Sequence, residues 1–412
     1  MRILSGKAAA KRVNQLERRV SDFSDLEPQV RRIVENVRRH GEVALLRYAS
    51  KWDGVVGRNL KVSQREMERA WNEASPRLRT SLRKAATDIR RFSNWQRPLA
   101  WSRRTDGMNL GQVVRPIASV GCYVPGGRHP LVSSLLMTVI PAQVAGVPEI
   151  SVVSPKPSTE MLAAAYMLGV RQFYRVGGAQ AIAALAFGTK SIHRVDKIVG
   201  PGNRYVTIAK KLVAFDTAID FLAGPTEAIV VSHAGQPAFI AADLVAQGEH
   251  DPDALPIFIT ISRQLAQRTA KVVKSLTENN EIARQSMARN GCVLLACSPG
   301  EAMEWANRIA PEHITVDPSA LPFVQNAGSI FLGPYSAQAA GDYVSGPNHV
   351  LPTAGVANFR GGLSVLDFVK IITVQQLSAQ GLRKIGPTVA HLAEVEGLQA
   401  HAESIRVRCA RA

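Results

Sequence analysis

The sequence predicts an α/β protein built on two parallel sheets, and three observations support that fold class. Between residues 116 and 232, short apolar runs alternate with helical patterns, which is the order of parallel βαβ units. The alternation resumes between residues 257 and 309, so a second α/β unit is expected. Three predicted strand ends carry glycine, as expected of tight βα turns: Val124-Pro-Gly-Gly127, Val176-Gly-Gly-Ala-Gln180 and Val199-Gly-Pro-Gly-Asn203.

Periodicity predicts the individual elements in chain order. Residues 1–105 are expected to be helical, with Val30, Ile33, Val34 and Val37 at helical spacing. The first α/β unit should hold strands at 117–124, 150–154, 173–176, 197–199 and 228–232, separated by helices at 131–147, 160–168, 179–186 and 204–213. The second should hold strands at 257–261 and 292–297 and helices at 263–274, 281–288 and 301–309. In the tail we expect a strand near 366–369 and a helix near 387–397.

Composition excludes several classes of protein. The chain has 412 residues, enough for two to three domains, and its hydrophobic fraction of 46% and charged fraction of 20% are ordinary for a soluble enzyme. No apolar run reaches the ~18 residues of a membrane helix, and the first residues lack an apolar secretion signal, so we expect a cytoplasmic protein. The cysteines show no CxxC spacing and are expected to be reduced and structural: Cys122, Cys292, Cys297 and Cys409.

The formal net charge of +17 makes nucleic acid a partner to consider, because Lys and Arg displace counterions from phosphates. The basic residues are spread over residues 11–104 and 263–289, and no recognised nucleic-acid-binding motif accompanies them. A solvated basic surface is the simpler explanation, so no nucleic-acid partner is expected. A basic nucleic-acid-binding protein is the alternative from another class, and salt-sensitive DNA retention without zinc would support it.

A candidate metal site begins where the helical pattern before Pro252 ends, in Val245-Ala-Gln-Gly-Glu-His-Asp. Gln247 and His250 are three residues apart, which on a helix directs two donor side chains to one place. Taken alone, such a histidine is more often a helix cap or a packed core residue. Similar polar groups recur downstream, and this favours a site: Glu312-His313, Asp342 with His349, and His401.

The glycine turns are candidate cofactor contacts, because backbone N–H groups at the carboxyl ends of parallel strands can approach phosphate. A single turn of this kind is more often only a tight connection. None of the three is a GxGxxG sequence, so a dinucleotide would bind through a variant site. The natural contacts there are Tyr123, Gln180 and Asn203.

Together these segments resemble the histidinol dehydrogenase family over nearly the whole chain, from Gly41 to His401. The matching motifs are Trp52-Asp53, Tyr123-Val-Pro-Gly-Gly127, Gly177-Gly-Ala-Gln-Ala181, Lys197-Ile-Val-Gly-Pro-Gly-Asn203, Ala223-Gly-Pro-Thr-Glu227, Glu249-His-Asp251, Pro311-Glu-His313, Gly341-Asp-Tyr343, Asn348-His-Val-Leu-Pro352 and Glu396-Gly-Leu-Gln-Ala-His401. The resemblance implies oxidation of L-histidinol to L-histidine through L-histidinal, the last step of histidine biosynthesis, with two successive hydride transfers to NAD.

The resemblance also implies a role for each matching residue. It assigns one Zn²⁺ per subunit to Gln247, His250, Asp342 and His401. It assigns catalysis to Glu312 and His313, with His313 as a neutral base near its ordinary pKa of ~6.5 and Glu312 activating water. Thr226, His349 and Glu396 would line the substrate beside His313 and the zinc ligands, and NAD would contact Tyr123, Gln180 and Asn203.

Two positions depart from the family pattern. Thr226 stands where serine is usual, which adds a methyl group to the pocket. This keeps open a related zinc- and NAD-dependent enzyme for another small polyol, such as a sulfonated propanediol. Gly248 replaces a more common alanine, which we expect to loosen the ligand helix by roughly 1 kcal/mol. The segment starting at Arg128 is also less typical.

For the whole chain, we expect two Rossmann-like domains with small dimerisation segments at both termini. The boundaries are an N-terminal helical segment at 1–21, a first α/β domain at 22–121 and 229–360 with most of the zinc and catalytic site, an inserted NAD-binding domain at 122–228, and a C-terminal dimerisation segment at 361–412. The resemblance implies a homodimer with shared active sites, in which His401 and Glu396 complete the neighbouring subunit's site.

Overall fold

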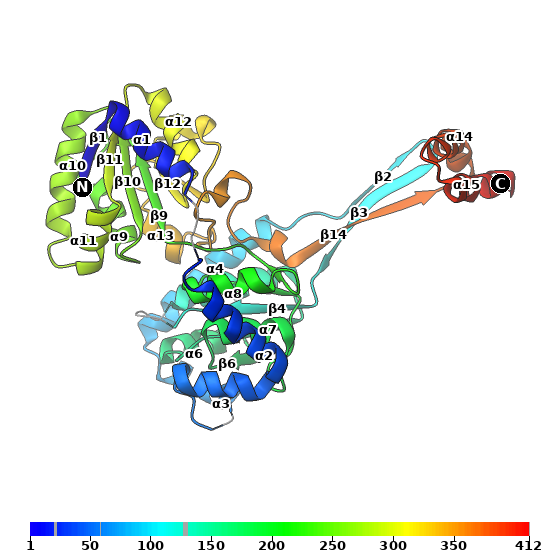
Figure 1. Cartoon of the computed structure of the whole chain (residues 1–412), viewed down its shortest axis with the longest axis horizontal. Coiled ribbons are helices and arrows are strands. Elements are labelled where there is room, and N and C mark those ends of the chain that lie inside the picture. Colours follow the sequence, from blue (N-terminus) through cyan, green and yellow to red (C-terminus); the bar gives the residue numbers. More distant parts are fainter. Residues whose placement is uncertain (20–22, 58, 127–130, 412) are drawn as a thin grey trace.

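The computed structural model describes residues 1–19, 23–57, 59–126 and 131–411, and all structural statements refer to these residues. They form two α/β lobes and a long arm that carries the C-terminal helices at its tip (Figure 1). Each lobe contains a parallel sheet, which confirms the parallel α/β fold class. No described helix is long and apolar enough to cross a membrane.

The lower lobe in Figure 1 surrounds a five-stranded parallel sheet of order β6-β5-β4-β7-β8. Its strands are β4 (Ser119–Tyr123), β5 (Glu149–Val153), β6 (Gln172–Tyr174), β7 (Lys197–Val199) and β8 (Ala218–Ile219), joined through α5 (Val132–Ala145), α6 (Thr159–Met167), α7 (Gly178–Phe187) and α8 (Arg204–Val213). The strand order reverses between β4 and β7. Parallel sheets of this kind bind ligands at the carboxyl ends of the two strands that flank such a reversal.

Three N-terminal helices also pack on this lobe: α2 (Glu27–Tyr48), continued by the π-helical turn η1 (Ala49–Asp53), α3 (Gln64–Glu73) and α4 (Pro76–Trp95). Val30 of α2 shares a core with Ile182 of α7, and Met67 of α3 shares another with Leu135 of α5. We expected residues 22–121 to join residues 229–360, and these helices instead cover the five-stranded sheet. An amphipathic pattern reveals that a helix has an apolar face, but not which sheet covers it.

The upper lobe surrounds a six-stranded parallel sheet of order β1-β11-β10-β9-β12-β13. Its strands are β1 (Arg2–Ser5), β9 (Glu227–Val231), β10 (Leu255–Thr260), β11 (Cys292–Leu295), β12 (His313–Val316) and β13 (Ser329–Leu332). The helices of this lobe are α1 (Gly6–Glu17), α9 (Pro237–Gly248), α10 (Arg263–Leu276), α11 (Glu281–Arg289), α12 (Pro299–Ile309) and α13 (Gln338–Tyr343), with 3-10 turns η2 (Pro318–Phe323) and η3 (Val356–Asn358).

The chain start belongs to this lobe rather than forming a separate helical segment at 1–21. Strand β1 pairs in parallel with β11, and Ala9 and Val13 of α1 are buried in the same core as Leu294 and Ile309. A four-residue strand is too short to reveal a period of two in the sequence. Strands β8, β12 and β13 are also short, and periodicity did not predict them.

The arm consists of an antiparallel sheet of order β14-β3-β2, made from β2 (Trp101–Thr105), β3 (Met108–Pro116) and β14 (Val369–Leu377). The 3-10 turn η4 (Val365–Phe368) lies at its base, and α14 (Ala379–Val395) and α15 (Gln399–Arg411) lie at its tip (Figure 1). The helical prediction for residues 1–105 therefore fails at β2. All five residues of that strand are exposed, so the sequence lacks the alternation that marks a half-buried strand.

Candidate active site

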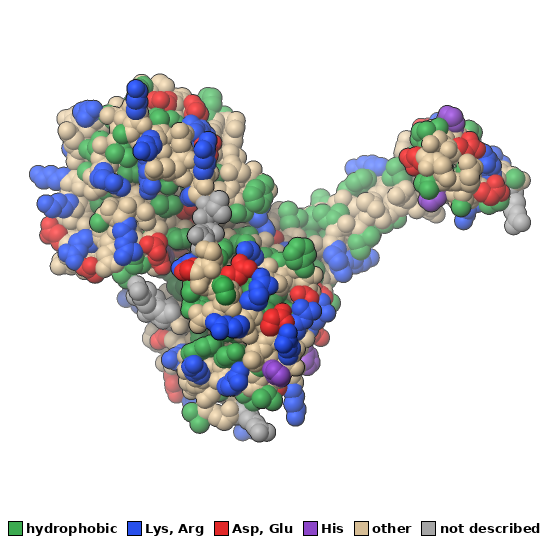
Figure 2. Space-filling view, in the orientation of Figure 1, with side chains coloured by type: hydrophobic (Ala, Val, Ile, Leu, Met, Phe, Trp, Pro, Cys, Tyr) green, Lys and Arg blue, Asp and Glu red, His purple; other side chains and the backbone are tan. Residues whose placement is uncertain are grey.

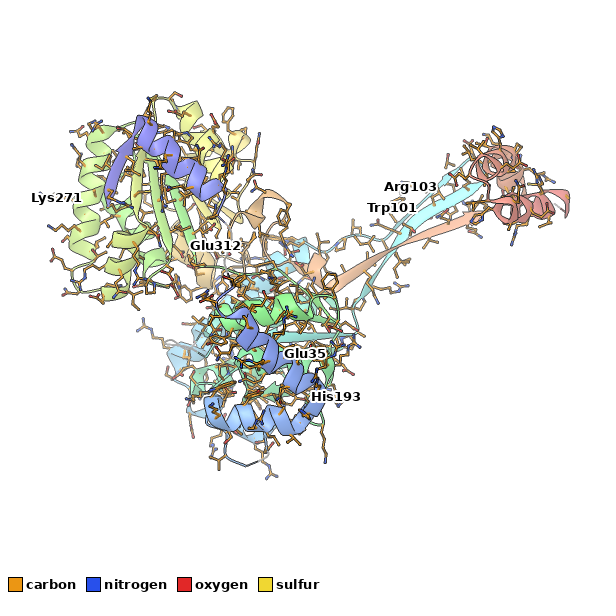
Figure 3. The ribbon with its side chains drawn as sticks, viewed as in Figure 1. Glu35, Trp101, Arg103, His193, Lys271 and Glu312 are labelled. Carbon is orange, nitrogen blue, oxygen red and sulfur yellow. The ribbon has the colours of Figure 1, made fainter. Side chains whose placement is uncertain are left out.

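The predicted acid and base lie at the amino edge of the six-stranded sheet. Glu312 precedes β12 and His313 is its first residue, paired in register with the residue after Glu227 on β9. Glu312 is 7% exposed and His313 2% exposed. The Nδ1 atom of His313 lies 3.7 Å from Oε2 of Glu312, and the backbone N–H of Glu227 donates to the same oxygen at 3.0 Å. Figure 3 shows Glu312 on the side of its lobe that faces the other lobe.

Asp342, in the last turn of α13, connects this pair to the expected metal ligands. One of its carboxylate oxygens lies 3.6 Å from Nε2 of His313, and the other accepts a hydrogen bond of 3.0 Å from Nε2 of Gln247. Its backbone carbonyl lies 2.8 Å from Nδ1 of His349. Burial raises the pKa of Asp342, but the hydrogen bond and charge of His313, with smaller contributions from His349 and His250, outweigh it and lower this pKa. His250 itself is exposed just beyond α9. The structure thus gathers six of the predicted site residues: Gln247, His250, Glu312, His313, Asp342 and His349.

Burial and neighbouring charge shift the pKa values of this cluster. Burial raises the pKa of Glu312 to about 8, against the opposing effects of His313 and the Glu227 N–H. Burial disfavours the charged form of His313, but the carboxylates of Glu312 and Asp342 outweigh it and raise the pKa of His313. The ordinary value of ~6.5 assumed from the sequence does not hold in this environment. The pair can therefore hold and exchange a proton near neutral pH.

Two further predicted site residues, the metal ligand His401 and the substrate contact Glu396, lie elsewhere in the single chain. His401 is exposed on α15 and Glu396 is exposed at the end of α14. These helices form the tip of the arm, far from α13, which carries Asp342 (Figure 1). Among the described residues, no three His, Cys, Asp or Glu side chains are close enough to hold a metal ion. Gln247 and Asp342 nevertheless touch, and His250 lies just beyond the end of the same helix as Gln247. The oxygen donors of Gln247 and Asp342 and the imidazole of His250 fit a divalent metal once a further imidazole is supplied.

The predicted cofactor residues lie at the carboxyl edge of the five-stranded sheet. Tyr123 ends β4, and its hydroxyl accepts a hydrogen bond of 3.1 Å from the N–H of Gly178. Gln180 is buried in the first turn of α7. Asn203 is exposed at the start of α8, where its side chain accepts from the N–H of Val206 at 3.2 Å. The structure brings these three residues to one edge, at the ends of β4, β6 and β7.

Glycine lets these turns pack against one another. At Gly200, where φ is +109°, an added Cβ would lie 2.1 Å from the carbonyl oxygen of Tyr123. At Gly177 it would lie 2.5 Å from the ring of Pro155. The backbone at this edge is therefore closely packed without a GxGxxG sequence. Gly127 and the segment starting at Arg128 lie outside the described residues.

Three residues that sequence reasoning did not assign also reach these sites. Asp53 is 7% exposed and accepts from the N–H of Gly177 at 3.2 Å and from Nε2 of Gln180 at 3.1 Å. Arg19 forms two hydrogen bonds, of 2.7 and 2.6 Å, with the buried carboxylate of Glu227. Asp53 and Glu227 each lie within a matching motif, Trp52-Asp53 and Ala223-Gly-Pro-Thr-Glu227, and that was the available signal. The burial that gives each carboxylate its role arises only from tertiary packing.

The two departures from the family pattern have different surroundings. At Gly248 an added Cβ would lie 2.7 Å from Oγ of the buried Ser286, so glycine makes room for that hydroxyl. Its helix cost is thus offset by packing that the sequence did not reveal. Thr226 is partly exposed, and its carbonyl accepts from the N–H of Leu255 at 2.8 Å, next to Glu227.

A separate depression of about 870 Å³ lies along α2. Its lining includes Arg31, Glu35, Arg39 and Trp52, and none of the predicted site residues. In Figure 3, Glu35 lies on the lobe opposite the one that carries Glu312. This depression is therefore not part of the candidate active site.

Comparison with known proteins identifies the family. The model of the histidinol dehydrogenase family matches residues 16–409. A histidinol dehydrogenase of Methanothermobacter thermautotrophicus is 45% identical over 97% of both chains, and one of Aquifex aeolicus is 44% identical over 93% of this chain and 92% of that one. The crystal structure of histidinol dehydrogenase from Elizabethkingia anophelis has a TM-score of 0.94 and 34% identity, covering 99% of this chain and 98% of that one. The chain therefore belongs to the histidinol dehydrogenase family.

Proposed function

We propose that the protein is a zinc-dependent histidinol dehydrogenase that oxidises L-histidinol to L-histidine in two steps through L-histidinal, using two NAD. The observation that carries this proposal is the buried Glu312–His313 pair beside Asp342 and Gln247. A histidine and a carboxyl group with raised pKa values can move the protons that both oxidations release. We further propose that the enzyme acts in the cytoplasm on this small molecule, without a nucleic-acid or membrane partner.

In the first oxidation, His313 accepts the hydroxyl proton of the substrate as a hydride passes from the carbinol carbon to the first NAD. Its buried position keeps water away from that carbon, and Asp342 stabilises the imidazolium that forms. In the second oxidation, Glu312 removes a proton from the water that adds to the aldehyde, and the hydrate then passes a hydride to the second NAD to give the carboxylate. The Glu227 N–H keeps one oxygen of Glu312 fixed during this step.

Gln247, His250, Asp342 and His401 would hold the zinc. When bound, the metal would orient the substrate and polarise its polar groups. Thr226, His349 and Glu396 would line the substrate. Tyr123, Gln180 and Asn203 would contact NAD at the carboxyl edge of the five-stranded sheet, where the N-termini of α7 and α8 favour an anionic pyrophosphate.

Steady-state NAD reduction tests the activity. L-histidinol should be used far more efficiently than a panel of small alcohols that includes a sulfonated propanediol. A higher kcat/KM for one of the other alcohols would favour the alternative function, a related dehydrogenase of another small polyol. The added methyl group of Thr226 is the sequence feature that allows this alternative. Absence of NAD reduction with every alcohol would overturn the proposal.

The arm supports a homodimer with shared active sites. Its tip buries only a small apolar cluster, formed by Ala390, Ala393 and Ala402. Hydrophobic side chains lie exposed along the arm and on its tip (Figure 2), among them Ile371 on β14 at 50% and Leu392 and Val395 on α14 at 57% and 72% exposure. A projecting antiparallel sheet with such a surface is stable only when another surface covers it. In the dimer, His401 and Glu396 would complete the site of the partner subunit.

Mixed dimers test this sharing. His250→Ala and His401→Ala homodimers should both be inactive. In a mixed dimer with ligands shared between subunits, one site carries both changes and the other carries neither. The purified mixed dimer, isolated through two different tags, should therefore recover about half of normal activity. An inactive mixed dimer would mean that His401 serves its own subunit.

A further inference from the structure

A buried ion pair lies beneath the turn that follows β7. Lys210 on α8 pairs with Asp220, which follows β8, and their side chains are 3% and 1% exposed. Such burial is costly for both charges unless their remaining hydrogen-bonding groups are satisfied. The contacts of this pair therefore indicate what it holds in place.

The pair binds both backbone groups of Gly200. The N–H of Gly200 donates to one carboxylate oxygen of Asp220 at 2.8 Å, and the ammonium of Lys210 donates to the carbonyl of Gly200 at 3.1 Å. The other carboxylate oxygen of Asp220 accepts from Lys210 and from the N–H of Phe221. Asp220 thus holds the N–H of Gly200, and Lys210 holds its carbonyl.

Gly200 needs such support because of its conformation and its place. Its φ of +109° is accessible to glycine and strained for other residues, and glycine is also the residue that loses most conformational freedom on folding. The turn leads within three residues to Asn203, the first residue before α8 and a proposed NAD contact. Tyr123, a second proposed contact, packs its carbonyl directly against Gly200.

Stability alone does not explain the pair. Replacing a buried ion pair by apolar side chains of similar volume is often neutral or stabilising. We infer that Lys210 and Asp220 are positioning residues for the cofactor: they hold the Gly200–Asn203 turn and the adjoining Tyr123 in the arrangement that binds the dinucleotide. This inference rests on the proposed NAD-dependent function and adds two residues that do not themselves touch the cofactor.

The test is the double variant Lys210→Met/Asp220→Leu, which replaces the pair by apolar side chains and leaves both backbone groups of Gly200 unpaired. The KM for NAD and the dissociation constant of NADH, followed by its fluorescence, should each rise about tenfold, the loss expected for hydrogen bonds to charged groups. The KM for L-histidinol and the metal content should not change. Asp220→Asn keeps one oxygen that can accept from Gly200 and should lose less affinity.

Lys197→Met is the matched control. Lys197 begins β7, at the end of the strand opposite Gly200, and forms a largely buried ion pair with Asp367 of η4. The two side chains are 15% and 10% exposed. This variant should lower the melting temperature without changing NADH affinity. Unchanged NADH affinity in the double variant, or an equal loss in the control, would overturn the inference alone. Failure of the unaltered chain to bind NADH would overturn both the inference and the proposed function.

Discussion

The two parallel sheets share a winding pattern but place their polar groups at opposite edges. In the five-stranded sheet, the proposed NAD contacts follow the carboxyl ends of β4, β6 and β7. In the six-stranded sheet, Glu312, His313 and Glu227 lie at the amino ends of β12 and β9, beside the end of α9. Strand order alone therefore does not decide which edge of a sheet holds the functional side chains.

Helix direction explains the difference. At a carboxyl edge the following helices present their N-termini, whose free N–H groups and positive partial charge favour an anion such as pyrophosphate. At an amino edge the preceding helices present their C-termini, whose negative partial charge favours a cation. Here that charge is joined by the carboxylates of Glu312 and Asp342. One lobe is thus suited to a dinucleotide and the other to a metal ion.

The sharpest test of this division is His250→Ala, which changes only the amino edge of the six-stranded sheet. The variant should lose its bound metal. Its activity should fall by about a thousandfold or more, because a bound metal contributes several kcal/mol to catalysis. NADH binding, measured by fluorescence, should persist. Loss of NADH binding in a folded variant would show that the two edges are not independent.

Glu312→Gln should separate the two oxidations. Only the second consumes water, so oxidation of supplied L-histidinal should slow by about a hundredfold, the range of general base catalysis, and more than the first oxidation. Single-turnover measurements of each half-reaction decide this. Equal losses in both would assign Glu312 a positioning role.

Tyr123→Phe tests the carboxyl edge of the five-stranded sheet. It removes the hydroxyl that accepts from Gly178 and leaves that N–H without its partner. The KM for NAD should rise roughly fivefold, since one neutral hydrogen bond is worth about 1 kcal/mol. Metal analysis serves as the control, and a loss of bound metal would contradict the separation of the two edges.

The smallest expected effect concerns a partly buried carboxylate beside the six-stranded sheet. Asp243 on α9 accepts from the N–H of Gln338 at the start of α13, and burial raises its pKa from 3.8 to about 6. The folded state then binds this proton more tightly than the unfolded state, so the free energy of unfolding falls as pH rises between these values. Asp243→Asn should remove that fall and stabilise the protein by about 1 kcal/mol at pH 7, after allowance for partial exposure.

Thermal unfolding at two pH values checks this prediction. At pH 4 both the aspartate and the asparagine are largely uncharged in the folded state, so the two proteins should differ little. At pH 7 the variant should melt at the higher temperature. An equal or lower melting temperature at pH 7 would show that the buried charge is compensated by its surroundings.

The sequence predicted the elements whose signal is local. The buried strands β4, β5, β7 and β10 appear as apolar runs, and their connecting helices show a helical period, because both patterns arise within a few neighbouring residues. The exposed strands of the arm and the short β1, β12 and β13 lack such a pattern. Strands β1 and β14 form because partner strands distant in the sequence, β11 and β3, complete their hydrogen bonds.

By itself, the sequence determined the parallel α/β class, the family, and the residue types of the candidate site, since motif and spacing are local properties. Only the tertiary structure decided that α2, α3 and α4 cover the five-stranded sheet, and that Asp342 meets His313 across 29 positions of chain. It also decided that burial raises the pKa of Glu312 and that Lys210 and Asp220 support Gly200. Desolvation and contacts between distant segments depend on what surrounds a side chain in space, and that information is not carried by its neighbours in sequence.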